Sequence, residues 1–266
     1  MNNFFYYVVL LMKDFIIFFH GHEGSSATVS QLKKLDNIDI IGFEPFDANK
    51  KPLISKDIKK IFTLIFNKNV KKNYIEAINP IYKYYYKRDF PEFDKSKSVG
   101  FKMRIKNLHD ILPIAKKHNV VVFILFRHNI LKWAISKCRP NSYQFKLVKG
   151  QIQENPPLNI DFNMLDKKIE ECKKLHEQKK MILNRCIKDR LRAYPIYYEY
   201  MNEDKEKYFG DILDKIGITL SPDELSNFIA KQNYFKKVHS DNLEDFVINY
   251  NELLTYVKKN NLEDYL

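Results

Sequence analysis

Residues 14–35 read DFIIFFHGHEGSSATVSQLKKL, and the order of apolar residues, glycines and serines in this stretch decides the fold. Residues 14–20 contain the unbroken apolar run that is typical of a buried parallel strand. Residues 26–36 carry apolar residues at helical spacing, with Val29 and Leu32 on one face. The sequence therefore predicts a strand, a tight loop and a helix in direct succession.

The loop between this strand and this helix has the composition of an anion-binding site. Gly21 and Gly24 allow a tight turn that leaves backbone N–H groups exposed. Ser25 and Ser26 add hydroxyl groups at the start of the helix, where the helix dipole favours negative charge. Ligands of open parallel sheets bind beyond the carboxyl ends of the strands, where this loop lies. We expect a bound phosphate or sulfate; the alternative is a turn that only caps the helix.

Two common nucleotide-binding motifs do not fit this loop. The motif G-x-x-x-x-G-K-[ST] requires a lysine after its second glycine, where this chain has Ser25. The spacing of Gly21 and Gly24 does not complete G-x-G-x-x-G. A kinase or nucleotide hydrolase is therefore the weaker hypothesis, and dinucleotide binding is weaker still.

The rest of the chain continues the alternation of strands and helices. Further apolar strands are predicted at 38–43, 99–105, 120–126 and 193–200. Helices are predicted from Ser55 as a cap and at 107–118, 129–138, 163–191 and 249–260. Residues 81–90 are expected to be a tyrosine-rich connection, and 139–162 a long loop and candidate lid. This pattern predicts one α/β domain whose parallel sheet is covered on both faces.

Composition excludes some classes of protein and favours others. The chain has 266 residues, 45% of them hydrophobic and 14% aromatic, so a disordered or collagen-like protein is excluded. The net charge of +12 favours anionic partners. Because the basic residues are scattered and no nucleic-acid-binding motif appears, we expect a small-molecule or glycan partner and no nucleic acid.

The cysteines and the N-terminal segment indicate the cellular compartment in which the protein is expected. Cys138, Cys172 and Cys186 are odd in number and widely spaced, which favours neither a disulfide framework nor a metal site. A reducing compartment, the cytoplasm, is expected. The apolar run 4–12 is too short to span a bilayer. We expect residues 1–13 to be a buried or mis-started leader, or alternatively a peripheral membrane contact.

A second candidate anion-binding element follows the strongest strand, in 120-VVVFILFRHNILKWAIS-136. Arg127 stands at the carboxyl end of the strand and Ser136 about two turns into the next helix. The guanidinium group of arginine can bind a phosphate through two N–H groups. A structural ion pair is the alternative role for Arg127.

The two stretches together resemble the nucleotide-binding signatures of sulfotransferases that use 3′-phosphoadenosine 5′-phosphosulfate (PAPS). That family has [KR]-S-G-[ST]-[ST] after the first strand, and later an arginine at a strand end followed by a helical serine. Four further stretches resemble bacterial carbohydrate sulfotransferases of the trehalose type, in the same order: 42-GFEPFD-47, 100-GFKMR-104, 194–218 and 236–253. The resemblance implies a P-loop NTPase-like, three-layer α/β/α fold with a central, mostly parallel sheet.

The resemblance also implies roles for individual residues. The phosphosulfate would be bound by His22, Glu23, Gly24, Ser25, Ser26 and Ala27. The 3′-phosphate would be bound by Arg127 and Ser136, with Lys236 and Lys237 as further contributors. His22 would be the catalytic electrophile and Glu44 the general base, and no metal is implied.

This chain departs from the family at the first two loop positions, where His22 replaces lysine or arginine and Glu23 replaces serine. We expect Glu23 to favour the protonated form of His22; otherwise Lys102 substitutes, or activity is lost. The resemblance implies transfer of a sulfuryl group from PAPS to a carbohydrate or glycolipid hydroxyl. The alternatives are a catalytically impaired nucleotide-binding protein of the same fold and a P-loop kinase-like phosphotransferase.

Overall fold

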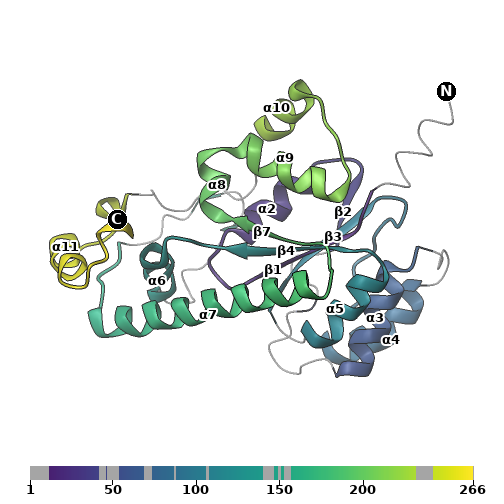
Figure 1. Ribbon diagram of the computed structural model, residues 1–266, viewed down its shortest axis with the longest axis horizontal. Coiled ribbons are helices and arrows are strands. Elements are labelled where there is room, and N and C mark those ends of the chain that lie inside the picture. Colours follow the sequence, from purple (N-terminus) through teal and green to yellow (C-terminus); the bar gives the residue numbers. More distant parts are fainter. Residues whose placement is uncertain are drawn as a thin grey trace.

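The computed structural model describes residues 12–41, 46, 54–68, 74–86, 88–105, 108–139, 147–148, 151–152, 157–231 and 242–265. Within these ranges a five-stranded parallel sheet has the strand order β2-β3-β1-β4-β7 (Figure 1). Its strands are β1 (Phe15–Phe19), β2 (Ile38–Ile40), β3 (Ser98–Arg104), β4 (Val121–Phe126) and β7 (Ala193–Tyr197). The predicted parallel sheet is confirmed.

Helices cover both faces of this sheet, which confirms the three-layer α/β/α prediction (Figure 1). One face packs against α3 (Ser55–Phe66), α4 (Tyr74–Tyr86), α5 (Leu108–Lys117) and α7 (Phe162–Lys188). The other packs against α2 (Ser25–Leu32), α8 (Tyr198–Glu203), α9 (Lys205–Ile216) and α10 (Pro222–Ala230). A third cluster joins α6 (Ile130–Cys138), α7, the short helix η2 (Leu243–Asp245), α11 (Tyr250–Lys259) and η3 (Glu263–Tyr265).

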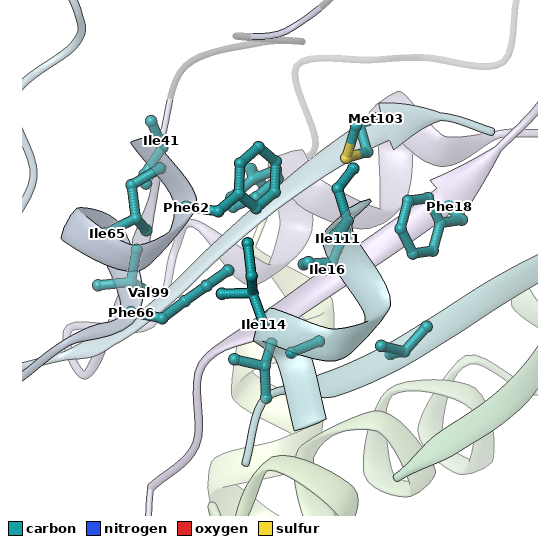
Figure 2. Packing of buried hydrophobic residues seen from close by; sticks show 14 of the residues in the cluster. Ile16, Phe18, Ile41, Phe62, Ile65, Phe66, Val99, Met103, Ile111 and Ile114 are labelled. Carbon is teal, nitrogen blue, oxygen red and sulfur yellow. The ribbon is translucent and has the colours of Figure 1, made fainter. Parts of the chain in front are cut away.

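The central strand β1 explains why its sequence is apolar without interruption. Ile16 and Phe18 are fully buried in the cluster that includes Phe62 of α3 and Ile111 of α5 (Figure 2). Phe15 lies in the cluster on the opposite face. Because a parallel strand covered on both faces buries every side chain, alternation between apolar and polar residues is lost.

Two predictions about the helices that cover the sheet are wrong. Ser55 does not cap α3: Ile54 is the N-cap residue, and the Ser55 hydroxyl donates to Asp110 Oδ1 at 2.6 Å. The tyrosine-rich segment 81–90 is largely not a connection, because its first six residues complete α4. Tyr82 and Tyr86, four residues apart, stack with their ring centres 4.2 Å apart on one face of that helix.

Two predicted boundaries also change. The strand predicted at 193–200 ends at Tyr197, and the next residues form α8. The segment 139–162 is not wholly irregular, since β5 (Leu147–Val148) and β6 (Gln151–Ile152) form a two-stranded antiparallel sheet. Its role as a lid stays a prediction. Residues 1–11 lie outside the described part of the chain, and no helix within that part has the length and apolar character needed to cross a membrane.

Candidate functional site

The carboxyl ends of two adjacent strands bring the predicted anion-binding elements together. Because β1 and β4 pair in parallel, the loop after β1 and Arg127 after β4 lie at the same edge of the sheet. Arg127 Nη1 donates to the His22 carbonyl oxygen at 2.8 Å, and His22 Nδ1 lies 3.0 Å from Ser136 Oγ. The turns at 22–26 and 127–136 therefore converge, as the sequence predicted.

The loop has two residues in the left-handed backbone region, Gly24 with φ 76° and His22 with φ 70°. Glycine is required at position 24, because a β-carbon there would lie 2.3 Å from the Tyr198 ring. The left-handed conformation costs a residue such as histidine about 1–2 kcal/mol. Hydrogen bonds from Arg127 to the His22 carbonyl and from Trp133 Nε1 to the Gly21 carbonyl, the latter at 3.0 Å, hold the loop in this shape.

Unsatisfied backbone donors collect at the start of α2. Within the described part of the chain, the N–H groups of residues 22–26 have no acceptor. The N–H group of Ala27 differs, because it already donates a hydrogen bond to the Gly24 carbonyl, at 3.0 Å, in the first turn of the helix. Consecutive free N–H groups at a helix N-terminus favour a bound anion. Five of the six residues predicted for the phosphosulfate, His22 to Ser26, keep a backbone N–H donor available there.

Lys102 supplies the positive charge that the loop lacks. It lies on β3, beside β1, and its side chain is only 1% exposed. Its ammonium group donates to Ser26 Oγ at 2.6 Å and lies 3.4 Å from Ser25 Oγ. A lysine of the neighbouring strand therefore contacts both serines at the start of α2, although the loop itself has no lysine. Lys102 was the predicted substitute for His22, although the GFKMR stretch does not say where the lysine points.

The charge state of His22 differs from the predicted one, which was a protonated imidazole. Burial, together with the nearby charges of Lys137, Arg127 and Arg104, lowers the pKa of His22 from 6.5 to about 4. The imidazole is therefore neutral at pH 7. Glu23 was expected to keep it charged, but the side chain of Glu23 turns away from the site.

Glu23 instead lies in the protein interior. Its side chain is fully buried and forms an ion pair with Lys179 of α7, and its Oε2 accepts the His20 N–H at 2.6 Å. The Glu23 carboxylate already has partners on the inner side of the loop, so binding of the nucleotide by Glu23 would use its backbone, and it stays a prediction. The backbone N–H of Glu23 remains a candidate donor.

Arg127 keeps hydrogen-bonding capacity for a ligand. Its Nε is buried and has no partner among the described residues, while its guanidinium group lies 4.7 Å from the centre of the Tyr198 ring. The next residue on α8, Glu199, accepts the Asn129 N–H at 3.0 Å and thereby fixes the turn after Arg127. A buried N–H group without an acceptor is unfavourable, so an anion at this position would satisfy it.

Three predicted site residues, Glu44, Lys236 and Lys237, lie outside the described residues, and their roles stay predictions. Among the residues that the structure does describe, no group of three or more His, Cys, Asp and Glu side chains could hold a metal ion.

Comparison with known proteins gives matches among solved structures alone. No family model matches the sequence, and no curated protein matches it. A mouse sulfotransferase complexed with PAP is 13% identical, with a TM-score of 0.49 over 95% of this chain and 88% of that chain. A retinol dehydratase in complex with androsterone and PAP is 12% identical, with a TM-score of 0.47 over 94% and 81%.

A sulfotransferase from Alicyclobacillus acidocaldarius is 13% identical, with a TM-score of 0.42 over 82% of this chain and 91% of that chain. Likeness at this distance carries no argument about function.

Proposed function

We propose that this protein is a sulfotransferase that moves a sulfuryl group from PAPS to a hydroxyl of a carbohydrate or glycolipid. The observation that carries the proposal is the convergence of two cationic, anion-binding elements. Lys102 lies at the loop 22–26, and Arg127 lies beside the same loop on its other side. A nucleotide with phosphate groups at two ends requires two such elements.

Each element would bind one end of the nucleotide. The N–H groups of residues 22–26, the hydroxyls of Ser25 and Ser26, and the ammonium group of Lys102 would bind the phosphosulfate. Arg127 would bind the 3′-phosphate together with Ser136, whose hydroxyl now contacts His22. Lys236 and Lys237 remain candidates for further contacts.

The reaction would be an in-line displacement at sulfur. The acceptor oxygen forms a bond to sulfur, the bond between sulfur and the bridging oxygen of the phosphosulfate breaks, and the acceptor proton passes to a base. Negative charge develops on the bridging oxygen, and a cation placed there in advance stabilises it. We assign this role to Lys102, because His22 is neutral before the nucleotide arrives. Glu44 remains the candidate base.

The position of Lys102 weakens the alternative that this is a catalytically impaired binding protein. That alternative came from the loss of lysine at position 22, and Lys102 supplies a positive charge at the same loop. The kinase-like alternative requires Mg²⁺ and ATP. Competition between ATP and PAP for the site separates the kinase-like enzyme from a sulfotransferase.

The proposal is tested by thermal shift with 3′-phosphoadenosine 5′-phosphate (PAP), followed by transfer of labelled sulfate from PAPS to a mixed glycan extract. PAP should raise the melting temperature, and Arg127→Ala should abolish the rise. Arg185→Ala, which removes a 64% exposed arginine of α7, is the matched control and should keep the rise. Absence of a PAP-dependent rise in the unmodified protein, or a rise with ATP and Mg²⁺ instead, would refute the proposal.

A further inference from the structure

The ion pair between Glu23 and Lys179 takes no part in the contacts proposed above. Both side chains are fully buried, although Glu23 belongs to the candidate anion-binding loop. Each partner also makes one backbone hydrogen bond. Glu23 Oε2 accepts the His20 N–H at 2.6 Å, and Lys179 Nζ donates to the Leu125 carbonyl at 2.5 Å. The pair therefore connects the carboxyl ends of β1 and β4 through the middle of α7.

Burying this pair is costly, so stability alone does not explain it. Burial raises the pKa of Glu23 to about 6 and lowers the pKa of Lys179, because it disfavours the charged form of each group. Apolar side chains of similar volume often replace a buried ion pair without loss of stability. Such a replacement removes a constraint on the positions of the two side chains, because a buried charged group must remain within hydrogen-bonding distance of its partner.

The fixed geometry is that of the loop. Lys179 Nζ lies 5.0 Å from the centre of the Trp133 ring, and the indole N–H of Trp133 donates to the Gly21 carbonyl. Gly21 and Glu23 are thus both held relative to Lys179 from the interior of the protein. Among the described residues, the N–H group of His22, which lies between these two anchored residues, has no acceptor.

We propose that Glu23 and Lys179 are positioning residues that hold the loop in the conformation in which its N–H groups bind the phosphosulfate. The affinity of the site for its nucleotide is then set by a buried ion pair that the ligand never touches. This inference rests on the proposed function for the identity of the ligand.

The variants separate positioning from stability. Glu23→Gln keeps an oxygen for the His20 N–H but removes the charge. Combining it with Lys179→Met leaves no charge buried there, so the double variant should melt within a few degrees of the unmodified protein. Lys180→Met is the matched control, because the neighbouring Lys180 pairs with Glu177 on the exposed side of α7, at 2.8 Å.

Two measurements are made on each folded variant: the Kd for PAP by calorimetry, and, without ligand, amide hydrogen exchange of the hydrogen-bonded loop amides of His20, Ala27 and Thr28. For the double variant we expect a Kd at least tenfold higher and faster exchange confined to the loop, with Lys180→Met unchanged in both. A Kd and loop exchange equal to those of the unmodified protein would overturn the proposal. If the unmodified protein does not bind PAP, the proposed function fails, and loop exchange alone decides the positioning role. Should the double variant not fold, Glu23→Gln by itself is judged by the same criteria.

Discussion

Acidification from pH 7 to pH 4 should destabilise this protein through His22. The pKa of His22 is about 4 in the folded protein, because of burial and the surrounding cations, and its ordinary value is 6.5. Between these values the unfolded chain binds more protons than the folded chain, so the free energy of unfolding falls as the pH falls. At about 1.4 kcal/mol for each factor of ten in the proton equilibrium, the contribution of His22 is about 3 kcal/mol.

The measurement is urea denaturation at several pH values between 7 and 4, for the unmodified protein and His22→Asn. Asparagine is chosen because it tolerates the left-handed conformation at φ 70°. His22→Asn should lose less unfolding free energy over this range than the unmodified protein, by about 3 kcal/mol. Comparing two proteins cancels the titration of shared groups, including His20, whose pKa burial lowers to about 3.

If the curves of His22→Asn and the unmodified protein run parallel from pH 7 to pH 4, the imidazole is not held neutral. In that case His22, rather than Lys102, regains the role of the catalytic cation.

Three further predictions concern Lys102 and two glycines. Lys102→Met should lower kcat for labelled-sulfate transfer about 10²–10³-fold while the protein stays folded by circular dichroism; an unchanged kcat would exclude Lys102 as the catalytic cation. Gly24→Ala should cost about 2–5 kcal/mol in urea denaturation, from φ 76° and the contact with Tyr198. Gly100→Ala places a β-carbon 2.1 Å from the Phe15 ring and should lower the free energy of unfolding by about 1–3 kcal/mol. The Kd for PAP should stay the same, and a changed Kd would contradict a purely structural role for Gly100.

The convergence of the two anion-binding turns could be predicted because it follows from parallel strands. The apolar runs 14–20 and 120–126 identify strands buried on both faces, and parallel strands end at the same edge of the sheet. Arg127 and the loop residue His22 follow those strands directly, so their proximity needed no knowledge of side-chain packing.

The direction of side chains from other elements could not be predicted. Glu23 is adjacent to His22 in the sequence, yet it points to Lys179, which is 156 residues away. Lys102 lies on an apolar strand, where the sequence alone does not tell whether its ammonium group meets solvent, a carboxylate or the loop serines. The protonation state of His22 depends on its burial and on the charges of Lys137, Arg127 and Arg104, which the loop sequence does not reveal, and this is why its expected charge was wrong.

The sequence by itself determined the five strands of the parallel sheet, the loop after β1 and the edge of the sheet at which the site forms. These features follow from hydrophobic periodicity and backbone chemistry, which act over a few neighbouring residues. Only the tertiary structure decided that Lys102 contacts the loop serines and that the Glu23 carboxylate points into the protein interior. Those outcomes depend on desolvation and charge pairing between segments far apart in the chain, and their energies exist only once the core has packed.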